Sequence, residues 1–386
     1  MNPIDIAIVG AGPAGSSTAI ALAQQGYHVA LLERAIFPRD KLCGDFLNPT
    51  NWPILDALEV SDELLRRPHA KISTFRMSAT NGAEAISPLP VQGERQIGLG
   101  LRRFHLDQVL LQRAKQIGVS VQEGVKVTGV EVDGRVWRLA IDHGGHRRLA
   151  QAKFLVGADG RNSLVARQLG ILSSRSQPSS SVGFEIQLSH VPGVRHSVEI
   201  HQFTGGYAGL VRIDERTVNL CFTVCRSQLG KARSFEHLQE HLLGENPLLH
   251  ALLAGAEPVS PLRTAWPVYF PQRRCFGAGF LLVGDAARVT EPVTGEGIFF
   301  ALRSGQLAAA TIASALREGN TTPARLRQYA EACRREFHGR LRLNSFIRVL
   351  MYRPNLLSMA IRLLGGRKPL LSTLVNTVCQ PRAAFG

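Results

Sequence analysis

The first third of the chain alternates short apolar segments with glycine-rich turns. Residues 4–9 and 29–32 are short and mostly apolar, as expected of strands that are buried on both faces. Residues 13–25, between them, are rich in Ala and Ser and are long enough for a helix. Together the three segments predict a strand–helix–strand unit of about 30 residues.

Helical periodicity recurs later in the chain. Within residues 103–118 the apolar residues repeat at helical spacing, so one face of a helix would be apolar. Another long helix is predicted for residues 297–316. The chain after residue 325 is also predicted to be helical, with breaks at Pro354 and at Gly365-Gly366.

Strand patterns dominate the middle of the chain. Alternation across residues 119–132 predicts a single strand, and short apolar runs at 154–156 and 280–283 predict two buried strands. Residues 180–225 alternate apolar and polar positions over most of their length. This pattern is typical of an antiparallel sheet.

Composition is that of an ordinary folded protein. The 386 residues are 45% hydrophobic and 19% charged, which allows one large or two interleaved domains and excludes general disorder. No stretch approaches 18 uninterrupted apolar residues, and the N-terminus does not resemble a signal peptide, so we expect a cytoplasmic protein. The six cysteines include no CxxC pair and the twelve histidines show no ligand spacing, so we expect reduced thiols and no metal site.

The net charge of +15 is concentrated at the C-terminal end. Residues 325–386 contain twelve Lys or Arg against Glu331 and Glu336. Such a region can bind an acidic carrier protein or an anionic membrane surface, or it can be a solvated helix face. Apolar runs at 346–351 and 356–364 carry arginines. Helices of this kind can lie along a membrane surface, or they can cover a groove that holds an apolar substrate. We expect no nucleic-acid partner.

The turn after the first predicted strand carries the first chemical signal. Gly10, Gly12 and Gly15 have GxGxxG spacing, and Glu33 ends the second strand. In such a unit the first glycine makes the turn, the second lets a pyrophosphate approach, and the third lets helix and strand pack closely. The helix N-terminus favours the phosphates, and Glu33 stands where a carboxylate would bind a ribose hydroxyl. The unit therefore predicts a dinucleotide site for either FAD or NAD.

Two later turns favour FAD. Residues 157–163, with Asp159-Gly160, resemble the DG motif of the flavoprotein hydroxylase superfamily, and residues 284–297 resemble its GD motif. The resemblance implies that Asp285 binds the ribityl chain and that backbone amides after Pro292 face the pyrimidine end of the flavin. It also implies an α/β fold: a Rossmann-type FAD-binding fold, glutathione reductase-like, with an inserted antiparallel β-sheet substrate domain and a helical C-terminus.

The loop at residues 37–45 narrows the family. Its sequence, FPRDKLCGD, resembles the FPR-x-K-x-CG segment of the geranylgeranyl reductase-like branch, which is related to the flavin halogenases. That resemblance implies that Cys43 and Gly44 lie beside the isoalloxazine and that Arg103 meets the cofactor; a surface salt bridge from Arg103 to Asp107 is the alternative. The aromatic stretch of the prenyl reductases is reduced to Tyr207, and the W-x-W-x-I-P stretch of halogenases is absent.

The resemblances imply a set of FAD-contacting residues and a pocket. The expected FAD contacts are Gly10, Gly12, Pro13, Ala14, Gly15, Glu33, Arg34, Cys43, Gly44, Arg103, Asp159, Gly160, Gly284, Asp285, Pro292, Gly295, Glu296 and Gly297. The candidate pocket residues are Cys43, Gly44 and Tyr207, with Trp266, Tyr269 and Phe270. No side chain is assigned a catalytic role, because the flavin would do the chemistry.

The expected domains follow the motifs. The FAD-binding domain would comprise residues 1–70, 98–175 and 275–324, and the substrate domain residues 71–97 and 176–274. Residues 325–386 would form the basic helical region.

Three functions suit these features. The first is a single-component monooxygenase that hydroxylates or epoxidises an apolar or aromatic, carrier-borne substrate through a flavin C4a-hydroperoxide, with NAD(P)H as electron donor. The alternative is an ene-reductase of a prenyl or polyene chain. The third is a flavin-holding partner protein that delivers electrons and docks through its tail.

Overall fold

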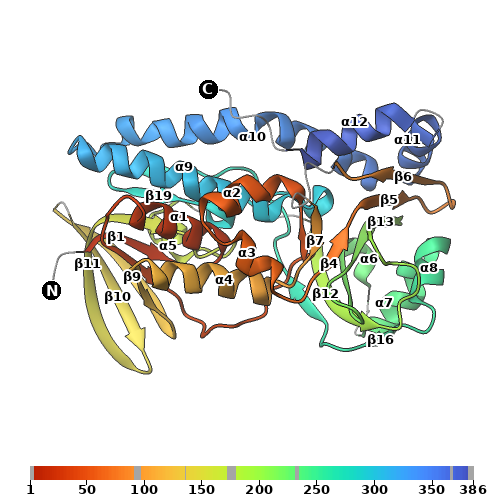
Figure 1. Ribbon diagram of the computed structural model, residues 1–386, viewed down its shortest axis with the longest axis horizontal. Coiled ribbons are helices and arrows are strands. Elements are labelled where there is room, and N and C mark those ends of the chain that lie inside the picture. The colour runs from red at the N-terminus through yellow and green to blue at the C-terminus, as the bar shows by residue number, and fades with distance from the viewer. Residues whose placement is uncertain are drawn as a thin grey trace.

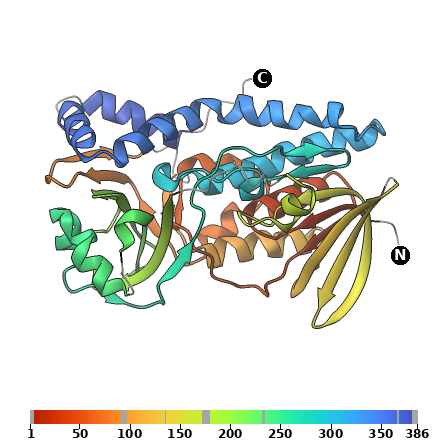
Figure 2. The ribbon, with the colours of Figure 1, turned by 180° about the vertical axis from the view of Figure 1, so that it is seen from behind.

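In the computed structural model, two lobes lie beneath a layer of long helices (Figure 1). The structure describes residues 4–90, 97–134, 136–171, 180–230, 234–365 and 368–380. Helix α10 (Pro323–Met351) leads from the larger, N-terminal lobe toward the smaller one, where α11 (Pro354–Gly365) and α12 (Lys368–Cys379) lie over a second sheet (Figure 2). The C-terminal part of the chain is therefore helical, as predicted. Helix α11 ends at Gly365, the first residue of the predicted break, and Gly366 lies outside the described residues.

The first sheet is built on the predicted strand–helix–strand unit. Strand β1 (Ile4–Val9) is parallel to β2 (Val29–Leu32), and α1 (Pro13–Ala23) connects them. The strand order is β18-β19-β11-β1-β2-β8. The bounds of the other four strands are β8 (Ser120–Gln122), β11 (His146–Gly157), β18 (Phe276–Gly277) and β19 (Phe280–Leu282).

Parallel pairing decides where the three glycine turns meet. Strands β11 and β1 are parallel, and so are β11 and β19. The turns that follow these strands therefore leave the sheet at the same edge, which is where open α/β sheets bind their ligands. Helices α4 (Arg103–Gln116) and α9 (Gly297–Arg317) pack against α1 and cover this part of the core.

One predicted strand is wrong in detail. Residues 119–132 form not one strand but β8 and the start of β9 (Val125–Asp133), and these two pair with different neighbours. Strand β8 is parallel to β2, whereas β9 forms a hairpin with β10 (Val136–His143). The chain turns at Gly124, whose φ of +70° is readily adopted by glycine. The sequence pattern does not show this turn, because Val121 and Val125 are an even number of residues apart and the alternation of apolar and polar residues continues across it.

The second sheet confirms the antiparallel pattern predicted for residues 180–225. Its order is β16-β12-β15-β14-β13-β5-β6, with β17 beside β12. One face packs against α7 (Phe235–His241) and α8 (Pro247–Leu253), and the other faces α11 and α12. Its strands are β5 (Thr74–Ser78), β6 (Glu84–Pro88), β12 (Ser181–Ser189), β13 (Ser197–Phe203), β14 (Gly206–Arg212), β15 (Val218–Cys225), β16 (Glu257–Pro258) and β17 (Arg263–Ala265).

Short elements join the lobes. A three-stranded sheet has the order β3-β7-β4. The joining elements are β3 (Phe46–Leu47), η1 (Pro49–Asn51), α2 (Trp52–Ala57), α3 (Ser61–Leu65), β4 (Ala70–Ile72) and β7 (Gly98–Gly100). The remaining elements are α5 (Leu164–Gln168), α6 (Arg226–Leu229), η2 (Leu243–Glu245), η3 (Gly284–Ala286) and η4 (Pro292–Thr294).

One described helix, α9, is long and apolar enough to cross a membrane. Of its most apolar 18-residue window, 61% is buried inside the protein. The helix packs against α1 and α10, and Ser17 Oγ donates a hydrogen bond to the Leu302 carbonyl oxygen at 2.8 Å. Its apolar character is therefore accounted for by core packing.

Candidate FAD and substrate site

The turn after β1 combines two kinds of glycine. Gly10 has φ +103°, and a Cβ there would lie 2.5 Å from the Ala158 carbonyl oxygen. A Cβ on Gly15 would lie 1.9 Å from the Gly10 carbonyl oxygen, so only glycine lets α1 approach the turn this closely. A Cβ on Gly12, at the N-terminus of α1, would meet no atom within 4 Å. Gly10 and Gly12 line a large cavity, whereas Gly15 does not.

Glu33, directly after β2, is hydrogen-bonded to the same turn. Its Oε2 accepts a hydrogen bond from the Ala11 amide at 2.8 Å, and its Oε1 accepts one from the Ala35 amide at 2.9 Å. The carboxylate is buried, yet it lines the cavity together with Arg34. Each carboxylate oxygen can accept a second bond, so Glu33 remains placed to bind a ribose hydroxyl.

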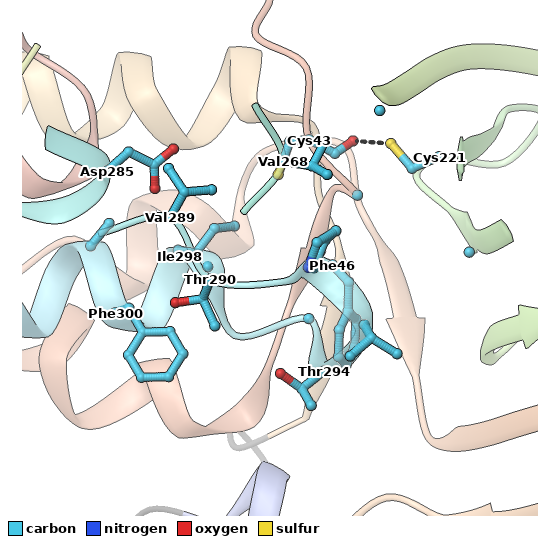
Figure 3. A pocket seen from close by; sticks show the side chains of 18 of the residues that line it. Cys43, Phe46, Cys221, Val268, Asp285, Val289, Thr290, Thr294, Ile298 and Phe300 are labelled. Carbon is cyan, nitrogen blue, oxygen red and sulfur yellow. Dashed lines mark hydrogen bonds between the residues drawn. The ribbon is translucent and has the colours of Figure 1, made fainter. Parts of the chain in front are cut away.

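The DG and GD turns both line the cavity, and their aspartates differ. Asp159 accepts hydrogen bonds from Ser163 Oγ and from two backbone amides at the start of α5, at 2.6, 2.7 and 3.1 Å. It therefore holds its own turn in shape. Asp285 is 39% exposed, points into the cavity (Figure 3) and lies 3.4 Å from Arg161, so it is the aspartate with free acceptor capacity.

The loop before α9 differs from the prediction at one residue. Pro292, Gly295 and Gly297 line the cavity as expected. Glu296 points elsewhere: it is 2% exposed, and its Oε1 accepts a hydrogen bond from Arg340 on α10 at 2.7 Å. The side chain of Glu296 is thus engaged with α10, and Glu296 does not line the cavity as its neighbours in the loop do.

Arg103 is part of the cavity wall and also forms an ion pair. It lines the cavity, and its guanidinium makes two bonds to Asp107, at 2.7 and 2.8 Å. Asp107 is fully buried, so this is not a surface pair; Arg39 lies 3.1 Å from the same carboxylate. Sequence reasoning missed Arg39, although its position in the FPR segment could have identified it.

Cys43 and Gly44 lie on the cavity wall where the two lobes meet. The Cys43 carbonyl oxygen accepts hydrogen bonds from Cys221 Sγ at 2.9 Å (Figure 3) and from Asn219 Nδ2 at 2.8 Å, both on β15. Burial raises the pKa of the Cys43 thiol to about 11, so it is neutral at physiological pH and is not an activated nucleophile.

Two buried carboxyls stand close to Cys43: Asp45 is the last residue of this loop, and Glu185 lies on a strand where no sequence motif marked it. Asp45, with φ +52°, accepts a hydrogen bond from the Arg103 amide at 3.0 Å. Burial raises the pKa of Asp45 well above its usual range, and the neighbouring Glu185 adds to this. Burial also raises the pKa of Glu185, on β12, to about 7.

A polar network connects the wall of the cavity with the outer helices. Tyr207 Oη, on β14, donates a hydrogen bond to Glu291 Oε1 at 2.9 Å, and Tyr352 Oη lies 3.4 Å from the same oxygen. Arg348 Nε lies 3.1 Å from Glu291 Oε2, and Thr223 Oγ1 lies 3.2 Å from Tyr352 Oη. Burial raises the pKa of Glu291, which favours a proton on this chain of groups.

Of the four aromatic residues expected to line the pocket, only Tyr207 does so. Trp266 is 42% exposed, Phe270 lies beneath the guanidinium of Arg273, and Tyr269 lies beneath that of Arg348. The three follow β17 in a segment whose Val268 does line the cavity, while these three aromatic side chains do not. The prediction for these three residues is therefore wrong.

The cavity itself is a single space of about 1200 Å³. At one end it contains the glycine turns, and at the other it runs between the second sheet and helices α10, α11 and α12. The walls of this second part are mostly apolar, and the clearest members of the set are Phe75, Met77, Leu89, Ile200, Val211, Ile347, Leu350, Leu357, Ile361, Leu371 and Val375.

The first part of the cavity fits FAD. Cβ atoms on Gly12, Gly44, Gly160 and Gly297 would meet nothing within 4 Å, so the chain leaves open space beside each of these cavity-lining glycines. The N-termini of α1 and α9 both open onto this space, which favours negative groups. Several cationic side chains line this space and suit a pyrophosphate: Arg34, Arg39, Lys41, Arg103 and Arg161.

The fold and these three turns define an FAD-dependent oxidoreductase. The chain belongs to the FAD binding domain family, whose model matches residues 3–341.

Its relatives include reductases and halogenases. Digeranylgeranylglycerophospholipid reductase 1 of Methanopyrus kandleri is 31% identical over 357 residues, which cover 86% of each chain. A tryptophan 2-halogenase of Chondromyces crocatus is 27% identical over 342 residues, covering 85% of this chain and 64% of that protein.

Among solved structures, a geranylgeranyl bacteriochlorophyll reductase-like protein from Thermoplasma acidophilum superposes with a TM-score of 0.80 at 19% identity, covering 97% and 95% of the two chains. At that identity the likeness concerns the fold alone. The resemblance to the geranylgeranyl reductase-like branch and to the halogenases is confirmed by the sequence relatives.

Proposed function

We propose that the protein is an FAD-dependent ene-reductase that saturates double bonds in a long prenyl-type chain. The observation that carries this proposal is the continuity of the cavity, which leads from the glycine turns to the helices α11 and α12 without interruption. An apolar corridor of this length suits a flexible hydrocarbon chain, because its burial is driven by apolar area and needs few polar contacts.

The cofactor and the protein's own residues would have different roles in the reaction. Bound FAD, once reduced by a donor such as NAD(P)H, would supply a hydride to one carbon of the double bond, and the other carbon would take up a proton. The chain's own groups would hold that proton near the wall: Tyr207 Oη and Glu291 lie in one hydrogen-bonded network, and burial raises the pKa of both. The apolar walls would exclude water from the site.

Sequence similarity supports the same reaction class. The M. kandleri relative is named for reduction of a lipid that carries geranylgeranyl chains. The neutral thiol of Cys43 suits such a substrate, and so does the small number of polar groups (Tyr207, Thr223 and Glu199) on the second-sheet wall of the cavity.

Hydroxylation or epoxidation by a monooxygenase is the second candidate. Of the aromatic stretch found in prenyl reductases only Tyr207 is kept, so the wall that meets the substrate differs from theirs. An oxygen-dependent reaction on an apolar, carrier-borne substrate would use the same cavity and the same electron donor.

One experiment separates the two. The FAD-loaded protein is reduced with dithionite without oxygen and given digeranylgeranylglycerophospholipid, with FAD-free protein as the control. We expect products that have gained two hydrogen atoms for each double bond reduced, measured by mass spectrometry. No anaerobic product, together with products that gain an oxygen atom in air, would overturn the reductase and support the monooxygenase.

A further inference from the structure

We infer that the outer mouth of the cavity docks on an anionic lipid bilayer, from which an apolar chain can enter the protein directly. The inference rests on the proposed function for the identity of that chain, but the docking surface is argued from other observations. We define the docking surface as the solvent-facing residues of α10, α11 and α12 between 342 and 377.

Large apolar side chains are concentrated on this surface. Of the twelve described residues with large, exposed apolar side chains, six lie in this segment, and their exposures range from 36% to 64%. These six are Phe346, Val349, Met359, Leu363, Leu370 and Leu374. An exposed apolar cluster of this kind in a folded protein marks an interaction surface.

The six side chains are arranged as three helical pairs. Phe346 and Val349 are three residues apart on α10, Met359 and Leu363 are four apart on α11, and Leu370 and Leu374 are four apart on α12. Residues at these spacings lie on the same face of a helix. The three helices are neighbours (Figure 1). Each of them exposes one apolar pair to solvent.

The docking surface is also the mouth of the cavity. Phe346, Met359, Leu363 and Leu374 are exposed to solvent and at the same time line the cavity that begins at the glycine turns. An apolar chain that leaves a membrane here would pass from lipid to protein without crossing water.

The charge of the surface selects an anionic partner. The last acidic residue of the chain is Glu336, and the residues after it include eight Lys or Arg. Arg342, Arg353 and Arg362 are exposed, whereas Arg348 is held by Glu291 and lies over Tyr269. Two copies of such a surface would repel each other, so charge complementarity favours an anionic bilayer over self-association.

A smaller polar hollow adjoins the mouth. It is about 450 Å³ in volume and shares Met359 and Leu363 with the main cavity. Its polar lining consists of Thr80, Asn81, Asn355, Ser358 and Arg362. Polar and cationic groups beside an apolar patch match the layered chemistry of a membrane interface, where headgroups lie next to acyl chains.

The test is flotation of the FAD-loaded protein with vesicles. One set contains phosphatidylcholine alone and the other contains phosphatidylcholine with phosphatidylglycerol. We expect flotation with the anionic vesicles only, decreasing as salt is added. The docking variant is Val349→Glu/Leu370→Glu, which changes two exposed residues that do not line the cavity. It should bind the anionic vesicles at least about tenfold more weakly, because both apolar contact and favourable charge are lost.

A matched control variant has the same chemistry at the other end of the molecule. Val132→Glu/Leu149→Glu changes two residues on β9 and β11 that are 61% and 67% exposed, against 47% for both Val349 and Leu370. It should float like the unaltered protein, and both variants should keep their FAD and their melting temperature.

Three outcomes would overturn the inference: no flotation with either vesicle, equal flotation with both, or equal loss in the two variants. A dimer in solution that only the docking variant dissociates would also overturn it in favour of self-association. Because flotation requires no turnover, the proposed reductase activity can fail while docking holds, and docking can fail while a detergent-dispersed substrate is still reduced.

Discussion

The buried ion pair between Arg340 and Glu296 joins the cofactor loop to the C-terminal helices. Arg340 Nη1 donates to Glu296 Oε1 and to the Val378 carbonyl oxygen, both at 2.7 Å, and Nη2 donates to the Gln380 carbonyl oxygen at 2.8 Å. Both members of the pair are 2% exposed, and the guanidinium lies over the ring of Phe299. We predict that Arg340→Met will destabilise the protein and loosen α12.

The expected magnitude follows from what the substitution leaves behind. Removing one partner of a buried ion pair costs about 3–5 kcal/mol, because the remaining charge is desolvated and unpaired. Burial raises the pKa of Glu296 and the charge and hydrogen bond of Arg340 oppose that rise, so the ionised form of Glu296 depends on Arg340. The double variant Arg340→Met/Glu296→Leu removes the stranded charge and should recover about 2 kcal/mol or more.

Urea unfolding followed by circular dichroism measures these differences, and limited proteolysis reports release of α12. The matched control is Arg303→Met, which breaks the 3.0 Å pair with Glu336. That pair is 34% and 25% exposed, so its loss should cost about 1 kcal/mol or less. The reasoning is refuted if Arg340→Met and Arg303→Met cost the same, or if the double variant is no more stable than Arg340→Met.

Two further predictions concern the cofactor end of the cavity. Asp285→Ala should weaken FAD binding by about 1–3 kcal/mol, because a charged acceptor is lost. Gly12→Val should weaken FAD binding more, because the valine side chain would fill the open space beside α1. Unchanged flavin affinity in both variants, measured by fluorescence titration, would contradict the assignment of these motifs. Burial raises the pKa of Glu185 from 4.5 to about 7, so the folded protein binds a proton that the unfolded chain has released. Its contribution to stability should therefore fall as the pH rises from 4.5 to 7 and stay level above that. Glu185→Gln should remove this part of the pH dependence of the urea midpoint, and an unaltered profile would show that Glu185 does not titrate in this range.

The sequence by itself determined the cofactor end of the site. Gly10, Gly12 and Gly15 lie close together in the turn and the first turn of α1, and their requirements are local: a left-handed backbone, an open approach and close helix packing. Short apolar runs at 154–156 and 280–283 precede the DG and GD turns, so buried strands could be inferred there, and parallel strands bring their following turns to one edge.

The tertiary structure decided how side chains beyond these motifs are used. Glu296 belongs to a recognisable motif, but its side chain turns toward Arg340 because α10 packs there. Tyr207, Glu291 and Tyr352 are far apart in the chain and show no common spacing, and they meet only because α10 ends against the second sheet.

The substrate end of the cavity was also a tertiary outcome. The amphipathic pattern of α11 and α12 indicates that one face of each helix is buried, but it does not say against what. Their packing over β5 and β6 encloses the corridor and leaves its mouth apolar and basic. Phosphate binding constrains residues that are neighbours in the sequence, so a local motif reveals it. An apolar wall can be built from many sequences, and its shape depends only on packing.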